Sequence, residues 1–283
     1  MKLEIGHEKT CDCNPKYLSC LTAAEWIKAQ LGVWNFSYEK RDVRDKKIHP
    51  AVFPIQLVEK IIKLFTHERE LVLDPFVGIG TVLLAAKELN RNAVGSDINK
   101  KYIEFAINRI GDPDGITTQI LLHDDARNLN QYLSPETVKL VVTSPPYANL
   151  LNRERKNKSR RADLQHNEQF GKIEQYSQEI RDLGLLAEKD FQEEFSIIFR
   201  SLHKFIKPNG HCVINVSDYW MDNERIPLHI NIVNAMNSAG YKLRNTIIWD
   251  RRNLVNNIGI FGYPSNYITM GTTFEYLLDF IPK

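Results

Sequence analysis

The feature that most constrains the fold is a strict alternation of short apolar runs and amphipathic segments between residues 71 and 143. Four to six consecutive apolar residues predict buried strands, and apolar residues at helical spacing predict the helices between them. Such alternation is typical of a doubly wound α/β domain with a mostly parallel sheet. The predicted order is strand 71–76, helix 81–89, strand 93–98, helix 101–110, and strands 119–122 and 140–143.

The segments on either side extend this pattern. Pro54 opens a predicted helix over 53–65, and residues 1–48 form an N-terminal extension, with a helix at 23–31, that we expect to pack on the main domain. The last two strands have no helix between them and are expected to pair antiparallel, which gives seven strands in all. The C-terminal elements are helix 191–205, strand 212–216, helix 230–236, and strands 246–249 and 276–280.

Composition sets only broad limits on the class of protein. A chain of 283 residues with 43% hydrophobic composition can bury a large core as one domain. No apolar run approaches the roughly 20 residues that span a bilayer, and the N-terminus lacks the apolar core of a secretory signal. We therefore expect a cytoplasmic protein without a membrane partner. The net charge of +2 does not identify a polyanionic partner.

A glycine-rich turn follows the first strand of the alternation, in the stretch DPFVGIGT at 74–81. Gly78 and Gly80 tolerate a left-handed backbone and leave room for a nucleotide-like ligand. The turn lacks the third glycine of a dinucleotide site, which disfavours NAD. Asp97 ends the next strand, where its carboxylate can accept both ribose hydroxyls. Asp124 and Asp125 follow the third strand. One of them can accept a hydrogen bond from an adenine amino group, and the other can cap the segment that begins there.

The stretch Thr143-Ser144-Pro145-Pro146-Tyr147 ends the fourth strand. The Ser144 hydroxyl and the Pro145 carbonyl offer two acceptors for the hydrogens of an exocyclic amine, and the two prolines hold them rigidly. Tyr147 offers a flat face for an extruded base. This pattern predicts methyl transfer to an exocyclic amine, with Ser144, Pro145, Pro146 and Tyr147 as the catalytic residues.

DPFVGIGT, GSDI at 95–98 and TSPPY together resemble the DNA amino-methyltransferases that use S-adenosylmethionine, over roughly residues 47–283. The resemblance implies a Rossmann-like sheet, S-adenosylmethionine as cofactor, and base flipping. Ser144 at the head of the tetrapeptide is typical of members that methylate cytosine N4, whereas Asp or Asn is typical of adenine N6 members. The implied cofactor-binding residues are His49, Pro50, Phe53, Asp74, Pro75, Phe76, Gly78, Gly80, Thr81, Asp97, Ile98, Asp125, Ala126 and Ser144.

The order of these motifs leaves the target-recognition element to 148–188, to 251–272 or to the N-terminal extension. A basic run after Tyr147 is suited to phosphate contacts with double-stranded DNA, and Arg251 and Arg252 are suited to base edges. A cognate restriction endonuclease is one candidate partner, and both a monomer and a dimer stay open. The expected phosphate-contacting residues are Arg153, Arg155, Lys156, Lys158, Arg160 and Arg161.

Two other functions compete with this interpretation. Methyltransferases that act on an RNA base share the motif order, although a 48-residue extension is short for a separate RNA-binding domain. A catalytically silent scaffold is a different class, and the intact tetrapeptide and glycine-rich turn disfavour it.

The four cysteines do not predict a disulfide framework in a chain without export signals. Cys11, Cys13 and Cys20, with His7 nearby, offer four zinc ligands but lack the paired spacing of known structural sites. We expect reduced thiols and no metal there, and Cys212 as a core residue.

Overall fold

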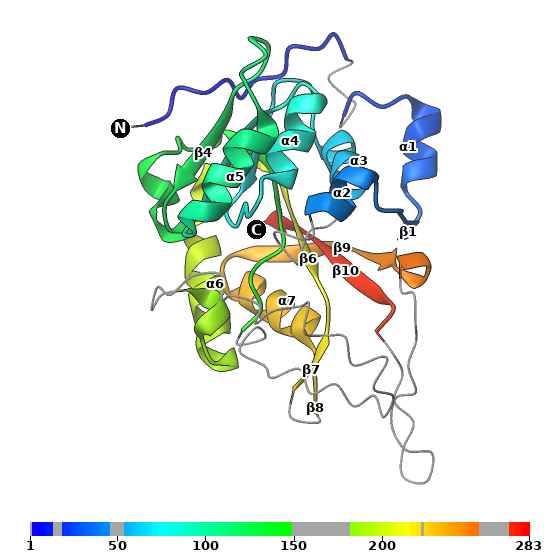
Figure 1. The fold of residues 1–283 in the computed structure, drawn as a ribbon, viewed down its shortest axis with the longest axis vertical. Helices are drawn as coiled ribbons and strands as arrows, with labels where there is room; N and C mark the ends of the chain where they lie inside the picture. The colour runs from blue at the N-terminus through cyan, green and yellow to red at the C-terminus, as the bar shows by residue number, and fades with distance from the viewer. Residues whose placement is uncertain (1, 14–18, 46–53, 149–181, 222–223, 255–271) are drawn as a thin grey trace.

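The computed structural model describes residues 2–13, 19–45, 54–148, 182–221, 224–254 and 272–283 (Figure 1). Its centre is an eight-stranded sheet in the order β1-β9-β10-β6-β5-β2-β3-β4. All neighbours in it are parallel except for the two pairs that β10 makes. The strands are β1 (Val33–Asn35), β2 (Leu71–Asp74), β3 (Asn92–Asp97), β4 (Gln119–His123), β5 (Val138–Thr143), β6 (Ile206–Val216), β9 (Tyr241–Asp250) and β10 (Phe274–Pro282).

The prediction of a doubly wound, mostly parallel sheet is confirmed, as is the antiparallel pairing of the last two strands. The predicted number of seven strands is wrong, because β1 from the N-terminal extension adds an eighth at the edge. Its residues Val33 and Asn35 pair in parallel with Ile248 and Asp250 of β9. The proposed boundary at residue 48 stays a prediction.

Helices cover both faces of the sheet (Figure 1). One face packs against α3 (Ile55–Phe65), α4 (Thr81–Glu88) and α5 (Lys100–Ile110), and the other against α6 (Glu188–Leu202) and α7 (Leu228–Ser238). Alternation along a strand sends successive side chains to opposite faces. In β2, Leu71 and Leu73 therefore join the cluster with α6 and α7, and Val72 joins the cluster with α3 and α4.

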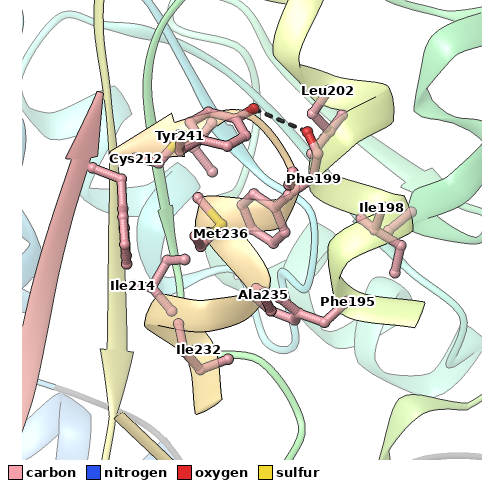
Figure 2. Close-up of a cluster of buried hydrophobic side chains, with 14 of the residues drawn as sticks. Phe195, Ile198, Phe199, Leu202, Cys212, Ile214, Ile232, Ala235, Met236 and Tyr241 are labelled. Carbon is pink, nitrogen blue, oxygen red and sulfur yellow. Dashed lines mark hydrogen bonds between the residues drawn. The ribbon is translucent and has the colours of Figure 1, made fainter. Parts of the chain in front are cut away.

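The core beneath α6 and α7 is apolar and closely packed (Figure 2). Phe195 and Phe199 of α6 stack with ring centroids 4.5 Å apart, and Met236 of α7 is fully buried beside them. The Tyr241 hydroxyl donates to the Phe199 carbonyl at 3.0 Å, which satisfies a polar group that burial would otherwise destabilise. Cys212 lies in the same cluster and is fully buried, as a core residue should be.

The turn between β2 and α4 depends on glycine. Gly78 and Gly80 both have positive φ, of 48° and 80°, and Gly80 forms the N-cap of α4. A Cβ at Gly80 would lie 3.0 Å from the Cβ of Ala106 and 3.2 Å from Cδ1 of Ile110, both on α5. Gly80 therefore allows α5 to approach the start of α4.

Two regions differ from the sequence prediction. The strand predicted at 212–216 begins earlier, because β6 runs from Ile206 and its pairing with β5 shifts register near its start. The shift absorbs the residues between Ile206 and His211, among them Pro208 and Gly210, which make an irregularity in the strand and not a chain reversal. A separate hairpin of β7 (Tyr219–Met221) and β8 (Glu224–Ile226) was not predicted.

The remaining short elements are helices α1 (Ala23–Ala29) and α2 (Lys40–Asp45), and the 3₁₀ turns η1 (Ala126–Gln131), η4 (Leu183–Leu185), η5 (His203–Phe205) and η6 (Arg252–Leu254). A complete capping box of Thr22 and Glu25 begins α1. Among the described residues, none of the helices combines the length and the apolar character needed to cross a membrane.

Gly80→Ala should destabilise the protein by about 2 to 4 kcal/mol, because it adds a crowded Cβ to a left-handed backbone. Gly115→Ala is the matched control, since Gly115 has a φ of 70° and open space around its Cβ position. It should cost only about 1 to 2 kcal/mol, the cost of the backbone alone. Urea denaturation measures both, and equal losses would contradict the packing role of Gly80.

Candidate active site

Two loops leave the sheet side by side because β2 and β5 are neighbours. From β2 the chain continues to β3 on one side, and from β5 it continues to β6 on the other. A ligand crevice is expected at the carboxyl ends of strands where the direction of winding reverses in this way. The Thr143 hydroxyl at the end of β5 donates to Oδ1 of Asp74 at the end of β2, at 2.7 Å, and both side chains are buried.

Asp74 fixes the start of the glycine-rich turn. Its Oδ1 also accepts from the backbone N–H of Phe76 at 3.1 Å. Burial raises the pKa of Asp74 to about 7, against the two hydrogen bonds that favour its carboxylate. The end of β3 supports the same turn, since the Val77 N–H donates to the Ser96 carbonyl at 2.9 Å.

Asp97 is the last residue of β3, and its carboxylate is held by backbone donors. Its Oδ2 accepts from the Gly78 N–H at 2.9 Å, and its Oδ1 accepts from the Asn99 N–H at 2.8 Å. Its side chain is partly exposed, and each carboxylate oxygen has a second lone pair to offer a ligand. Burial raises the pKa of Asp97 to about 6, and the nearby Asp182 contributes to this rise.

The two carboxylates after β4 are engaged within the protein. Oδ1 of Asp125 caps η1 by accepting from the Arg127 N–H at 2.9 Å, and its Oδ2 lies 2.6 Å from the Arg127 guanidinium. Arg127 also contacts Glu194 of α6 at 2.6 Å. Asp124 accepts from the Tyr132 hydroxyl at 2.6 Å and from two further donors, and these bonds lower its pKa against the opposing effect of burial.

The tetrapeptide is anchored through its tyrosine. The Tyr147 hydroxyl accepts from the Ser217 N–H at 2.8 Å, and its ring lies nearly parallel to that of Tyr219, with centroids 6.0 Å apart. Pro145 is buried, whereas Ser144 and Pro146 are partly exposed. The ring of Tyr147 is thus held in one orientation, with one of its faces toward Tyr219.

Several residues beside these loops were not predicted. Asp182 is buried and caps η4, and nothing in the local sequence links it to Asp97 across the intervening chain. Ser217 and Tyr219, which orient Tyr147, directly follow β6, and their place at a strand end was the available signal. Asp218 between them is buried and accepts from Nδ1 of His229 at 2.6 Å.

The predicted DNA-contacting arginines that the structure describes have partners within the chain. Arg251 forms an ion pair with Glu275, and its guanidinium lies 5.0 Å from the ring centroid of Trp249. The side chain of Arg252 is 77% exposed and pairs with Asp250 at 2.7 Å. Several predicted site residues lie outside the described residues: His49, Pro50, Phe53, Arg153, Arg155, Lys156, Lys158, Arg160 and Arg161.

Five residues predicted to contact a cofactor lie at the same edge of the sheet, next to the turns already described: Pro75, Phe76, Thr81, Ile98 and Ala126. The Pro75 carbonyl accepts from the Ser96 hydroxyl at 3.1 Å, and the Thr81 hydroxyl accepts from Arg109 at 2.8 Å. The structure thus brings the turn after β2, Asp97 and the tetrapeptide to one edge, while Asp125 and Ala126 follow β4 farther along it.

Comparison with known proteins gives a consistent result. A family model described as a DNA methylase matches residues 12–108 and 138–278. The type II methyltransferase M.HpaI of Haemophilus parainfluenzae is 45% identical over 78 residues, which cover 28% of this chain and 25% of that protein. M.HindIII of Haemophilus influenzae is 49% identical over 67 residues, or 24% and 22% of the two chains. The chain thus matches about a quarter of the length of these curated relatives.

Among solved structures, TrmN from Thermus thermophilus superimposes with a TM-score of 0.52 at 15% identity. The match covers 86% of this chain and 53% of that one. A likeness at this identity concerns the fold, and it agrees with the doubly wound sheet described above.

The raised pKa of Asp74 predicts a specific pH dependence of stability. A folded-state pKa of about 7, above the ordinary value of 3.8, means that stability is lost as the carboxyl ionises with rising pH. The neutral variant Asp74→Asn avoids this loss. Its stability relative to the wild type should therefore rise by roughly 2 to 3 kcal/mol between pH 5 and pH 8.

Denaturant unfolding at several pH values measures the difference. Asp124→Asn is the matched control, because the pKa of Asp124 is lowered and its carboxyl stays ionised in both folded and unfolded chains over this range. The free energy of unfolding of Asp124→Asn should differ from that of the wild type by the same amount at every pH in this range. If the difference between Asp74→Asn and the wild type is also independent of pH, Asp74 ionises normally in the folded protein.

Proposed function

This chain belongs to the DNA methylase family, and we propose that it transfers a methyl group from S-adenosylmethionine to the N4 amine of cytosine in DNA. The observation that carries the proposal is the hydrogen bond between Thr143 and Asp74. It joins the strand ends from which the glycine-rich turn and the tetrapeptide emerge, so a cofactor on one loop and an amine on the other would share a crevice.

The residues present fit the proposed cofactor. Asp97 holds its carboxylate at the carboxyl end of β3 with lone pairs left for the ribose hydroxyls, and Gly78 beside it adds no side chain. The absence of a third glycine favours a single nucleoside over a dinucleotide. When bound, S-adenosylmethionine supplies an electrophilic methyl group. His49, Pro50 and Phe53 are proposed to contact its methionine end, and Asp125 and Ala126 its adenine end.

The tetrapeptide is proposed to orient the acceptor amine. The nitrogen lone pair of such an amine is delocalised into the base, so acceptors for both of its hydrogens favour a geometry in which the lone pair faces the methyl donor. Ser144 and the carbonyl of Pro145 provide these acceptors. Tyr147, held by Ser217 and Tyr219, is proposed to support the flipped base.

The choice of cytosine rests on Ser144. A neutral hydroxyl at the head of the tetrapeptide is typical of the N4 type in the family that the motifs resemble, whereas a carboxylate or amide is typical of the N6 type. The adenine N6 amine is the alternative acceptor, and an amine on an RNA base is a further one.

The polynucleotide is proposed to lie along the basic run at 152–161, which would contact phosphates through its lysines and arginines. Arg252 is the better candidate of the two later arginines, because its side chain is exposed while Arg251 is engaged with Glu275 and Trp249. A restriction endonuclease that reads the same sequence is proposed as a functional partner, by similarity to type II methyltransferases.

The direct test is product analysis. The full chain is incubated with labelled S-adenosylmethionine and DNA from a methylation-deficient strain, or with RNA, and the digested nucleosides are separated by mass. We expect label in N4-methyldeoxycytidine. Label in N6-methyldeoxyadenosine would replace the proposed base, and label in RNA alone would replace the proposed substrate.

Tyr147→Ala provides the control within the same assay. It should lower turnover at least about a hundredfold, because the acceptor base loses its support, while the affinity for S-adenosylmethionine changes little. Tyr147→Phe keeps the ring beside Tyr219 and should retain more activity than the alanine variant. A large loss of cofactor affinity in Tyr147→Ala would contradict the assigned role.

A further inference from the structure

Three thiols and one imidazole lie close together near the amino-terminal ends of the strands, opposite the carboxyl ends that carry the candidate active site. The side-chain sulfurs of Cys11, Cys13 and Cys20 and a ring nitrogen of His67 all lie within 4.8 Å of one another. His67 is buried, and the three cysteines are partly exposed and free of disulfides. His67 precedes the first residue of β2, whereas Asp74 ends that strand, so the cluster and the crevice lie at opposite ends of β2.

The sulfur–nitrogen distances in this cluster match those around a tetrahedral zinc ion. With zinc–sulfur bonds of about 2.3 Å and zinc–nitrogen bonds of about 2.0 Å, a tetrahedron places sulfur and nitrogen about 3.5 Å apart. Nδ1 of His67 lies 3.3 Å from Sγ of Cys11 and 3.5 Å from Sγ of Cys20. We propose that Cys11, Cys13, Cys20 and His67 bind one structural zinc ion.

The chemistry of the cluster favours zinc over other common ions. Thiolate and imidazole ligands in a tetrahedral arrangement select zinc, whereas magnesium and calcium require oxygen ligands. Three thiolates around a divalent ion leave one net negative charge. The ammonium of Lys9 lies beside the cluster, where it donates to the carbonyl of Cys13 at 2.8 Å, and it can offset that charge.

The turn that carries the histidine is itself held in place. The His67 N–H donates to the Glu70 carboxylate at 2.8 Å, and the Glu70 N–H donates to the His67 carbonyl at 3.3 Å. These bonds fix the position from which the imidazole reaches the sulfurs.

The zinc would hold the N-terminal segment against the amino-terminal edge of the sheet, along which residues 2–13 run (Figure 1). The Leu3 N–H donates to the Tyr132 carbonyl at 2.8 Å, the Gly6 carbonyl accepts from Asn92 at 2.8 Å, and the His7 carbonyl accepts from Lys207 at 2.9 Å. Leu3 and Ile5 at the start of the segment also pack against the hydrophobic core beneath α6 and α7. A four-ligand metal site would restrain the later part of the segment, around Cys11 and Cys13.

The sequence alone predicts reduced thiols without a metal and offers His7 as the only nearby histidine for a fourth ligand. Nδ1 of His7 lies instead 3.3 Å from the carbonyl of Ile5, and the fold supplies His67 in its place. His67 lies 47 residues after Cys20, and a ligand so distant along the chain does not form a local sequence motif with the cysteines.

Metal content of the untagged full chain tests the proposal. Protein purified from zinc-supplemented cells should contain about one zinc per chain by mass spectrometry, and cobalt in its place should show thiolate charge-transfer absorption. Cys20→Ser and His67→Ala should each lose most of the zinc. Cys212→Ala is the matched control, because Cys212 lies in the core away from the cluster, and it should keep the full zinc content.

Two further measurements keep the test independent of folding and of methyl transfer. His67→Cys preserves a tetrahedral ligand set and should retain zinc, and circular dichroism reports whether each variant is folded. A wild-type chain without zinc, whose cluster thiols react freely or form a disulfide, would overturn the proposal. Zinc content unchanged in folded Cys20→Ser and His67→Ala would overturn it equally.

Discussion

The hydrogen bond from Thr143 to Asp74 is the interaction on which the arrangement of the candidate active site depends. It is buried, it joins the ends of the neighbouring strands β5 and β2, and it lies at the point where the winding of the sheet reverses. A buried carboxylate is unfavourable unless donors satisfy it, so Thr143 and the Phe76 N–H stabilise a group that the apolar surroundings disfavour. The hydrogen bond between Thr143 and Asp74 therefore fixes the positions from which the loops after β5 and β2 begin.

A carboxylate held by hydrogen bonds also orders the end of β3, the next strand of the sheet. Asp97 accepts backbone N–H groups from the glycine-rich turn and from its own strand end, which fixes its carboxylate before any ligand arrives. On the acceptor side, Ser217 and Tyr219 restrain Tyr147. Both halves of the proposed site are therefore oriented by the protein itself, and pre-organisation of this kind lowers the cost of bringing a donor and an acceptor together.

How far the sequence predicts this structure depends on the range of the interactions. The alternation of β2, α4, β3 and α5 arises from local periodicity and was predicted to within a few residues. Asp97 and the tetrapeptide could be placed because strand ends meet at one edge of a parallel sheet. Strand β1 was missed because it has three residues and pairs with β9, some 215 residues away.

The other omissions have similar causes. His67 and Asp182 owe their positions to packing between distant segments, which no local pattern records. The start of β6 was missed because Pro208 and Gly210 are unfavourable inside a regular strand and occur here at a register shift. The partner of Arg251 likewise follows from the fold, because Glu275 lies on β10 beside β9.

The affinity of Thr143→Val for S-adenosylmethionine, measured by titration calorimetry, tests the central claim most directly. Valine preserves the shape of the threonine side chain and removes the donor to Asp74. We predict that the variant binds S-adenosylmethionine roughly tenfold more weakly, a loss of about 1.4 kcal/mol. This loss is expected even though Thr143 lies on β5, which leads to the acceptor loop and not to the cofactor loop. Thr137→Val removes a hydroxyl before the other end of β5, where it donates to the Ser134 carbonyl, and should bind as the wild type does. Equal affinity of Thr143→Val and the wild type would contradict the account.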